Sequence, residues 1–406
     1  MLETIVLIQD FAHVNGGNAK VAISEAIALK ERGYRVILFS AVAPIENTLV
    51  EKGVEVFCLN IKDSLHEKNK IRAIINGIWN GYAKKKFNEI LSSLNPNTTI
   101  VHFHCWVKAL SASLFAVTAK YNFRIVITLH DFFTICPNGG LFNYPDNNVC
   151  RLSPMSVKCQ FCNCDSRSRL YKYWRLIRQY LFIRAFNKNQ YVYLYSISDI
   201  TDEKIAKRLS HTVRKTFRVD NPIDINNHGY IDIHHDGYYT AISRISKEKG
   251  VDMFCEAMRN LGLKGQVLGD GPMLEYYKEK YPEVLFRGWC NEKEKTEYLK
   301  ITKCLILTSR WYETFGLVVS EMKSFGIPSI VPDECAASEQ IIDGETGFVF
   351  ESRNQLSLER KIKQFEKCDI NKIHHNVIAD SKLCCTLNTH IDKVIECYNE
   401  ILKDEY

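Results

Sequence analysis

The chain has 406 residues, of which 46% are hydrophobic and 25% are charged. This composition excludes a largely disordered chain, and the length favours two domains of about 200 residues each. No apolar run reaches the roughly 18 residues that a membrane-spanning helix needs, and residues 1–9 resemble a buried strand, not a secretion signal. We therefore expect a cytoplasmic protein whose 15 cysteines are mostly reduced thiols or metal ligands.

Charge is distributed unevenly along the chain. The formal net charge is +6, yet residues 151–190 alone hold nine Lys or Arg against a single acidic residue, Asp165. The same segment is rich in Tyr, Trp and Phe. A surface of this kind favours anionic partners.

The first half of the chain alternates short apolar strands with amphipathic helices. A strand over 4–9 leads through a Gly16–Gly17 loop into a helix over 19–33, which ends at Gly33, a favourable C-cap. A second helix is predicted over 108–121. Further strands are predicted at 34–40, 54–60, 99–105 and 124–130. This order is typical of a parallel sheet that is covered on both faces.

A second alternating set begins after Pro222. It has a helix at 250–261 and strands at 239–245, 266–271, 284–289, 304–309 and 328–332. The polar, His-rich stretch near 225–237 is the expected linker.

These two sets predict an α/β protein with two Rossmann-like, doubly wound parallel-sheet domains that face a central cleft. The first domain covers residues 1–222 and carries a Cys-rich insertion at about 132–168. The second covers residues 223–385. Residues 386–406 are expected to form a helix that packs back towards the first domain.

Two glutamates eight positions apart, Glu313 and Glu321, are the most informative pair in the sequence. If a helix starts near Thr314, the backbone N–H groups from Thr314 to Leu317 can bind a diphosphate. Glu321 then lies about two turns further along on nearly the same face, where its carboxylate can accept hydrogen bonds from a ribose diol. The alternative is a pair of solvated surface glutamates.

Two cations, Arg244 and Lys249, lie five residues apart across a predicted strand-to-helix turn. Arg offers a planar fork and Lys a point charge, so together they can stabilise a leaving nucleoside diphosphate. A metal ion does this in other sugar transferases, but no suitably placed Asp-x-Asp signature accompanies the pair. We therefore expect catalysis without a metal or another cofactor. The alternative is a solvated pair near a helix start.

Six short motifs follow one another along the chain: Gly16–Gly17, His130–Asp131, Ala241–Gly250, Gly269–Pro272, Phe286–Gly288 and Glu313–Glu321. In this order they resemble the motifs of the retaining family 4 glycosyltransferases (glycosyl transferases group 1), which have the GT-B two-domain fold. The resemblance extends over most of the chain and is strongest from Tyr239 to Phe350.

The resemblance implies a hexosyltransferase that retains the anomeric configuration. The first domain would bind the acceptor, and the second would bind a nucleotide-sugar donor such as a UDP- or GDP-sugar. The implied acceptor is a glycan, carried on a lipid, in the synthesis of a surface polysaccharide such as lipopolysaccharide. Two alternatives stay open: a nucleotide-sugar epimerase or hydrolase of the same fold, and a non-catalytic sugar-nucleotide-binding protein.

The resemblance also implies three groups of site residues. The catalytic group is His130, Glu313, Arg244 and Lys249. The donor-binding group is Gly269, Gly271, Gly288, Thr314, Phe315, Gly316, Leu317 and Glu321. The acceptor-side group is Gly16, Gly17 and His104.

Histidines mark two of the predicted strand ends. His130 would bond a sugar hydroxyl or support positive charge on the sugar, unless it is a structural hydrogen-bonding residue. His102 and His104 alternate along one strand and so face the same side of the sheet. They would line the same cleft or form a core pair bonded to the backbone.

Five cysteines crowd into residues 136–164. Cys159 and Cys162 have the two-residue gap that lets two thiolates share one tetrahedral ion, and Cys136 and Cys150 would complete a four-sulfur zinc site. Cys164 would be spare or would substitute for one of them. A metal would order a long loop, and the alternatives are free thiols or disulfides.

Residues 166–188 mix Arg and Lys with aromatic and aliphatic residues at near-helical spacing. A basic amphipathic helix can lie on the anionic inner face of a membrane, so peripheral attachment is one interpretation. A core-facing helix with a solvated basic face is the other. We expect no nucleic-acid partner, because no base-reading motif accompanies the charge.

Overall fold

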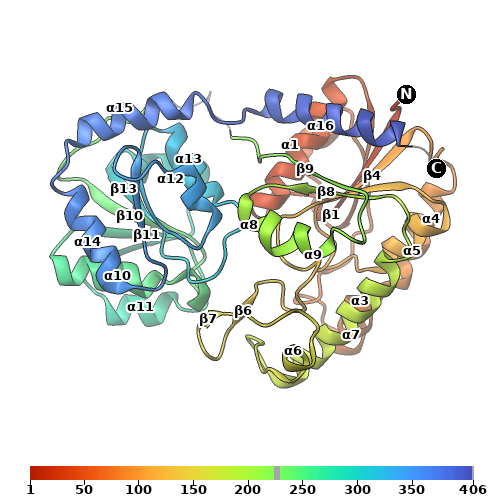
Figure 1. The fold of residues 1–406 in the computed structure, drawn as a ribbon, viewed down its shortest axis with the longest axis horizontal. Helices are drawn as coiled ribbons and strands as arrows, with labels where there is room; N and C mark the ends of the chain where they lie inside the picture. Colours follow the sequence, from red (N-terminus) through yellow and green to blue (C-terminus); the bar gives the residue numbers. More distant parts are fainter. Residues whose placement is uncertain (224–228, 405–406) are drawn as a thin grey trace. The chain divides into compact units, whose positions relative to one another are not determined.

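The computed structural model describes residues 1–223 and 229–404. Contacts between Cα atoms divide the chain into two compact units (Figure 1). The first unit comprises Met1–Gly140, Leu152–Pro222 and Leu387–Tyr406, and the second comprises Leu141–Arg151 and Ile223–Thr386. Part of the predicted linker, residues 224–228, lies outside the described residues.

A seven-stranded parallel sheet forms the centre of the first unit, in the order β3-β2-β1-β4-β5-β8-β9. Every residue of the central strands β1, β4 and β5 is buried, as expected for a sheet covered on both faces. The strands are β1 (Thr4–Phe11), β2 (Arg35–Val42), β3 (Glu55–Cys58), β4 (Thr99–Phe103), β5 (Arg124–Thr128), β8 (Val192–Ser196) and β9 (Lys215–Arg218).

Helices connect these strands. They are α1 (Gly17–Glu31), α2 (Asn47–Glu51), α3 (Lys70–Ile78), α4 (Gly81–Leu91), α5 (Ser113–Lys120), α6 (Val157–Phe161), α7 (Arg169–Phe186), α8 (Asp199–Thr201), the π-helical turn η1 (Asp202–Ala206) and α9 (Lys207–Leu209). The C-terminal helix α16 (Leu387–Lys403) belongs to the same unit, and its Ile391, Val394 and Tyr398 share a core with Ile5 and Leu7 of β1.

The second unit contains a six-stranded parallel sheet in the order β12-β11-β10-β13-β14-β15. The strands are β10 (Tyr238–Ile242), β11 (Gly265–Leu268), β12 (Leu285–Gly288), β13 (Thr302–Ile306), β14 (Ser329–Pro332) and β15 (Gly347–Phe350). Around them lie η2 (Lys247–Lys249), α10 (Val251–Leu261), α11 (Leu274–Lys280), α12 (Glu292–Leu299), α13 (Leu317–Ser324), η3 (Ala336–Gln340), α14 (Gln355–Phe365) and α15 (Ile370–Ser381). A short antiparallel hairpin, β6 (Phe142–Asn143) with β7 (Asn148–Val149), is grouped with this unit.

The predicted fold class, with two doubly wound parallel sheets, is confirmed. One helix start was predicted too early, because α5 begins at Ser113 and not near residue 108. The N–H groups of Lys108, Ala109 and Leu110 instead bond the buried Asp10 carboxylate at 2.8–2.9 Å. In the described part of the chain, no helix is both long enough and apolar enough to cross a bilayer.

Candidate functional site

The predicted donor residues gather at the carboxyl edge of the second sheet. From β10 the chain proceeds to β11 and β12 on one side, and later from β13 to β14 and β15 on the other. The adjacent strands β10 and β13 therefore mark the point where the strand order reverses, and open α/β sheets bind ligands there. Arg244 and Lys249 follow β10, and Glu313 follows β13.

Lys249 and Glu313 form the centre of this site. The Lys249 Nζ lies 2.6 Å from Glu313 Oε1, and both side chains are largely buried. The same oxygen accepts hydrogen bonds from Ser309 Oγ and from Trp311 Nε1 at 3.0 Å. Nζ also lies 4.9 Å from the centroid of the Trp311 ring, a cation–π distance. Among the described residues these bonds all end on Oε1, so Oε2 is available to a ligand.

Electrostatics keep Glu313 ionised. Burial acts to raise the pKa of its carboxyl, but the charge of Lys249 and the hydrogen bonds from Lys249, Ser309 and Trp311 outweigh burial, so the pKa is lower than usual. Glu313 is therefore an acceptor at neutral pH and not a proton donor. Arg244 is exposed in the loop after β10, and its guanidinium bonds no side chain among the described residues.

The helix start at the Glu313–Glu321 motif differs from the predicted one. Helix α13 begins at Leu317, with Gly316 as its N-cap in the left-handed conformation (φ 83°), so Thr314 and Phe315 are still in the loop. The prediction that Glu313 and Glu321 share a helix face is therefore wrong, because Glu313 precedes the helix. Glu321 lies within α13 and pairs with Lys295 of α12, a residue that the sequence did not single out.

The predicted glycine turns lie beside the same edge. Gly269 follows β11, and a Cβ there would lie 2.0 Å from the carbonyl oxygen of Ser243, which follows β10. A Cβ on Gly271 would meet the Ile245 carbonyl oxygen at 2.4 Å. These glycines therefore allow the β10 and β11 loops to approach closely. Gly288, at the end of β12, has φ 74° and open space around it.

The predicted acceptor-side residues gather at the carboxyl edge of the first sheet. Gly16 is the N-cap of α1 and Gly17 its first residue, and both follow β1. His104 follows β4 and His130 follows β5. Because β1, β4 and β5 are neighbours, these residues come to one edge. His104 Nδ1 lies 3.0 Å from His130 Nε2, a hydrogen-bonding distance. One of these two nitrogens therefore carries a proton and donates it to the other.

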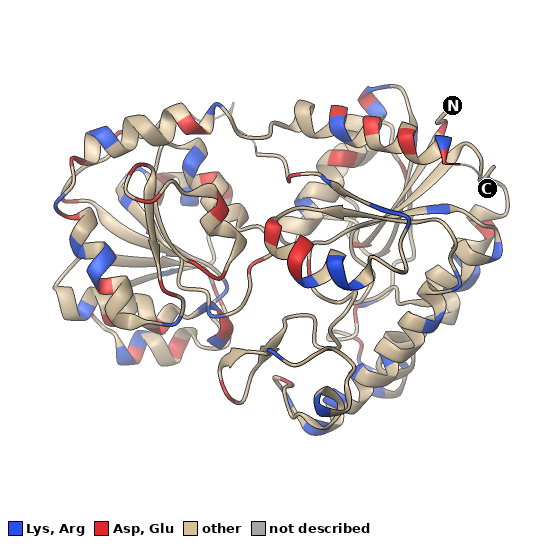
Figure 2. Cartoon of the chain, viewed as in Figure 1, with Lys and Arg blue, Asp and Glu red and all other residues tan. Residues whose placement is uncertain are grey.

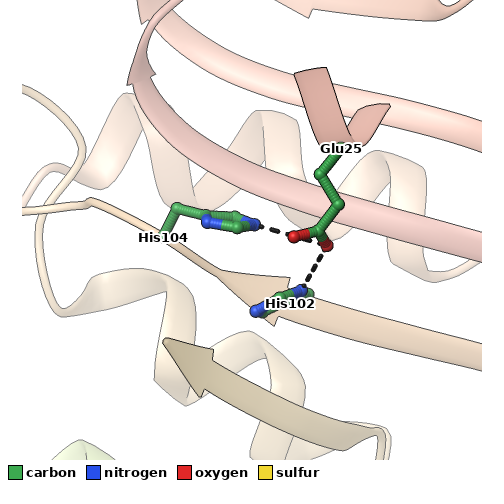
Figure 3. A group of neighbouring side chains, drawn as sticks. All are labelled: Glu25, His102 and His104. Atoms are coloured by element: carbon green, nitrogen blue, oxygen red, sulfur yellow. Dashed lines mark hydrogen bonds and ion pairs between the residues drawn. The ribbon is translucent and has the colours of Figure 1, made fainter. Parts of the chain in front are cut away.

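The buried carboxylate of Glu25 points towards both His102 and His104 (Figure 3). Glu25 of α1 lies 3.0 Å from His102 Nδ1 and 3.7 Å from His104 Nε2, the latter beyond hydrogen-bonding distance. Its other oxygen lies 3.3 Å from His390 Nε2 of α16. The side chains of His102 and His104 are buried and contact other side chains around Glu25, not the backbone, and the sequence did not reveal this network.

The network fixes the charges of its members. Burial alone would raise the pKa of Glu25, but the neighbouring His102 and His104 hold it well below its usual range. Burial, together with His104, lowers the pKa of His102 to about 4. Burial and the neighbouring histidines also hold the pKa of His130 well below its usual value. His130 is therefore neutral and Glu25 ionised at neutral pH.

Glu25, His102 and His104 offer ligand atoms within 4.8 Å of one another, close enough for a metal ion. Hydrogen bonds already use these atoms. His102 bonds Glu25 through Nδ1 and Thr128 Oγ1 through Nε2 at 2.7 Å, and Tyr398 Oη donates to Glu25 at 3.2 Å. The arrangement is that of a hydrogen-bonded network. Asp131, next to His130, is also buried, which raises the pKa of its carboxyl to about 6.

A cavity of about 450 Å³ lies in the first unit. It is bordered by the segment after β3, by α3 and by the segment after β4. Lys62, Arg72 and Lys108 line it, against one acidic residue, Glu67. The cavity therefore has a positive balance of charge.

The predicted cysteine ligands lie in different environments. Cys136, Cys159 and Cys164 are buried, and Cys150 and Cys162 are half-buried. Cys159, a predicted ligand, and Cys164, a predicted spare or substitute, approach the same side chain, the buried Lys172 of α7.

This chain is similar to a known protein family over part of its length, and to individual proteins and solved structures. Residues 233–382 match the family Glycosyl transferases group 1. Two uncharacterized proteins from the cps region of Klebsiella pneumoniae are similar to the chain. One is 25% identical over 321 residues, covering 75% of this chain and 78% of the relative. The other is 30% identical over 120 residues, covering 28% of this chain but only 33% of the relative.

A GDP-mannose-dependent alpha-mannosyltransferase of Corynebacterium glutamicum is 26% identical over 111 residues, covering 27% of this chain and 26% of that protein. Among solved structures, a glycosyltransferase from Rickettsia africae has a TM-score of 0.66 at 19% identity, covering all of both chains. Anabaena HepE in complex with UDP has a TM-score of 0.65 at 14% identity, covering 98% of this chain and all of that one. Residues 233–382 are therefore similar to the group 1 glycosyltransferases, and the chain has the GT-B fold of these solved structures.

Proposed function

We propose that this enzyme transfers a hexose from a nucleoside-diphosphate sugar, with retention, to a glycan acceptor in surface polysaccharide synthesis. The observation that carries the proposal is the Lys249–Glu313 pair at the reversal point of the second sheet, with Arg244 exposed beside it. Relatives encoded in a cps region support the biological role, and the UDP complex and the GDP-mannose-dependent relative support a uridine or guanosine diphosphate donor.

The second unit would hold the donor. The ammonium of Lys249 and the guanidinium of Arg244 neutralise the diphosphate as its bond to the sugar breaks. The start of α13 adds backbone N–H groups and the positive end of the helix dipole. Oε2 of Glu313 then accepts hydrogen bonds from hydroxyl groups of the sugar. Glu321 releases Lys295 and accepts hydrogen bonds from the ribose diol instead.

The first unit would present the acceptor and the reacting region. His130, held neutral, can exchange a hydrogen bond with a sugar hydroxyl, and the contact with His104 orients its ring. The carboxylate of Glu25 and the ring of His102 pack beside His104 and restrict its orientation. The positively lined cavity supports an acceptor that carries negative charge, as a lipid-linked diphosphate does.

Attachment to a membrane surface is the localisation that we propose. Helices α3 and α7 contact each other, because the Trp174 Nε1 donates to the Ile74 carbonyl at 3.0 Å. Neither helix contains an Asp or Glu, and Lys and Arg recur along them (Figure 2). Both expose large apolar side chains, namely Ile71, Ile74, Ile75, Leu170, Ile177 and Tyr180. This α3–α7 face suits an anionic bilayer.

A donor screen tests the reaction. Purified full-length protein is incubated with UDP-, GDP- and ADP-hexoses, with and without a mixture of lipid-linked glycans, and released nucleotide is measured. We expect slow release from one donor class that accelerates severalfold when acceptor is present, and a product with the anomeric configuration of the donor. Rapid donor consumption without acceptor, or no consumption of any donor, would contradict the proposal.

Flotation with vesicles tests the membrane surface. Wild-type protein should float with vesicles that contain phosphatidylglycerol, and less so at high salt, because lipid charges are screened. Replacing Ile74 and Ile75 by Ser should reduce flotation severalfold. Val50 on α2 is a matched control, since it is an exposed apolar residue outside the α3–α7 face. Equal flotation of both variants would remove this surface from the proposal.

A further inference from the structure

The cavity of the first unit holds three cations that no carboxylate neutralises. Its volume of about 450 Å³ lies within the range of roughly 300–1,000 Å³ that is typical of small-molecule sites. Lys62, Arg72 and Lys108 line it from three separate segments of the chain. In the described part of the chain, none of the three forms an ion pair with an Asp or Glu. Positive charges gathered in a cavity without counter-charges favour an anionic ligand.

The other polar groups on the wall are compatible with such a ligand. The one acidic residue that lines the cavity, Glu67, accepts a hydrogen bond through Oε1 from the Asn69 N–H at 3.0 Å, just before α3 begins. Ser64, Asn76 and Tyr82 add hydroxyl and amide groups to the wall. Groups of these kinds can both donate and accept hydrogen bonds, as sugar hydroxyls require.

Contacts within the first unit hold the walls of the cavity together. The buried Asp10 carboxylate accepts a hydrogen bond from the Lys108 N–H at 2.8 Å, and the Lys108 carbonyl accepts one from the Ser64 N–H at 2.9 Å. Asn80, the buried N-cap residue of α4, donates to the Ala109 carbonyl at 2.9 Å. The segments after β3 and β4 and the start of α4 are thus joined without a ligand, which lowers the ordering cost of binding one.

Helix α3 has two different faces. Arg72 and Asn76, one turn apart, line the cavity. Ile71, Ile74 and Ile75 lie on the opposite side of the helix, and each is more than half exposed. These isoleucines belong to the α3–α7 face, which we propose to lie on the bilayer. A ligand that combines phosphate with a lipid chain suits both sides of α3.

The cavity also lies close to the residues that we assign to the reacting region. Lys108 follows His104 in the segment after β4. Burial raises the pKa of Asp131, the residue after His130, and a hydrogen bond from the Phe133 N–H and the charge of Lys108 oppose this rise. A molecule that is held in the cavity at one end can therefore extend towards His130 at the other.

We propose that Lys62, Arg72 and Lys108 bind the diphosphate that joins the acceptor glycan to its lipid. The inference rests on the proposed transfer to a lipid-linked glycan, and it names the group by which the acceptor is positioned. The guanidinium of Arg72 suits bidentate contact with phosphate oxygens, and the two ammonium groups act as point charges. A diphosphate carries more negative charge than the phosphodiester of a phospholipid, so three cations favour the diphosphate over the surrounding lipid.

Calorimetric titration of geranyl diphosphate, a soluble isoprenyl diphosphate, into the full chain tests the site. The Lys249→Met/Arg244→Gln variant serves as the host, because its donor site lacks both cations and does not compete for the probe. We expect one geranyl diphosphate to bind per chain. Adding Lys62→Gln, Arg72→Gln or Lys108→Gln to this host should weaken binding about 10-fold in each case, as loss of a charged hydrogen bond does.

Lys85→Gln is the control variant, because Lys85 is an exposed lysine of α4 outside the cavity. It should bind the probe as the host does. The three cavity cations are exposed as well, so their replacement should leave the thermal unfolding temperature unchanged. In an otherwise wild-type chain, Arg72→Gln should raise KM for a lipid-linked acceptor about 10-fold with little change in kcat, since Arg72 positions the acceptor and does not touch the reacting atoms.

Two further measurements distinguish the acceptor diphosphate from the phosphate of the surrounding membrane. Geranyl monophosphate should bind the host severalfold more weakly than geranyl diphosphate, and phosphatidylglycerol vesicles should not displace the diphosphate. In flotation with the same vesicles, Arg72→Gln should behave like Lys85→Gln, whereas Ile74→Ser/Ile75→Ser should float less.

Four results would overturn the proposal: no binding of geranyl diphosphate by the host, equal binding by the host and all three cavity variants, equal binding of the monophosphate, or displacement by the vesicles. Displacement would assign the cavity to phospholipid headgroups. These outcomes are separable from that of the proposed sugar transfer, because the titration needs no donor and uses a chain whose donor site is disabled.

Discussion

One carboxylate oxygen of Glu313 accepts hydrogen bonds from three side chains. We expect its two oxygens to have different roles, and a substitution can test this. Lys249, Ser309 and Trp311 all bond Oε1, and we propose that Oε2 bonds the donor sugar. Glu313→Gln should lower kcat/KM about 10²–10³-fold, the usual cost of losing one positioned polar group. Affinity for the nucleoside diphosphate alone should stay equal or rise, because Lys249 no longer has a competing carboxylate.

Steady-state kinetics and nucleotide titration of the same preparation check this expectation. Glu345→Gln is the control, since Glu345 is an exposed glutamate in the same unit. A parallel loss of nucleotide affinity and kcat/KM in Glu313→Gln would show that Glu313 organises the whole pocket and does not act on the sugar.

His102 makes the stability of the first unit depend on pH. Its pKa is about 4 in the folded chain and near 6.5 when unfolded, so the unfolded state binds the proton first as pH falls. Stability is therefore complete above pH 6.5 and declines towards pH 4. At about 1.4 kcal/mol per pKa unit, the loss from this residue is roughly 3 kcal/mol.

Urea unfolding at several pH values between 7 and 4 measures this decline. His102→Gln removes the titrating group and should flatten the curve over that window, although it lowers stability at pH 7. The low pKa of Glu25 adds a decline at still lower pH, because its ionised form is favoured in the folded state. Identical pH slopes for wild type and His102→Gln would contradict the assignment.

The sequence located the site residues that lie at strand ends, because turns and helix starts have local signals. Lys249, Glu313, Gly269 and His130 were predicted in this way, and each follows a strand in the structure. Residues such as Glu25 and Lys295 gave no such signal. Glu25 lies within α1 and reaches His102 across 77 positions of chain, and Lys295 reaches Glu321 from a different helix. Only the strand order brings them together.

At the scale of elements, the start of α13 depends on one glycine. Gly316 has φ 83°, and a Cβ there would lie 2.7 Å from Ala337 Cβ. Gly316→Ala should destabilise the second unit by about 1–3 kcal/mol and weaken donor binding, because the first N–H groups of α13 would move.

Gly344→Ala is the matched control for this change. Gly344 has φ 84°, but a Cβ there would meet open space. The control therefore reports the backbone strain alone, and the difference between the two variants reports the contact with Ala337. Thermal unfolding with and without nucleotide measures both effects. Equal donor affinity in the two variants would show that the helix start does not contact the ligand.

Element boundaries were the least predictable part of the fold. The apolar strands β1, β4 and β5 are central and gave continuous hydrophobic runs, whereas β9 is an edge strand with only Phe217 buried. Helices α5 and α13 begin later than predicted for different reasons. Asp10 captures the N–H groups before α5, and Gly316 turns the chain before α13. The first cause is a contact between distant parts of the chain, and the second is the conformation of a single residue. Neither produces a periodic pattern of hydrophobic residues in the sequence.

At the scale of the whole molecule, each unit presents its functional residues at the carboxyl edge of its own parallel sheet. In the first unit these are histidines over a buried carboxylate, and in the second they are cations and glutamates beside a helix start. In the function that we propose, the second unit binds the donor and the first provides the reacting region. The presence of two parallel sheets could be predicted from the sequence, because both halves of the chain alternate strands with helices.

The central claim is that the second unit binds a nucleoside diphosphate through Lys249. Calorimetric titration of UDP, GDP and ADP into the full chain tests it most directly. We predict one-to-one binding of UDP or GDP, about 10²-fold weaker binding by Lys249→Met, and unchanged binding by Lys247→Ala, which alters an exposed lysine of the same short helix. Absence of binding by every nucleotide, or equal affinity in wild type and Lys249→Met, would contradict the account.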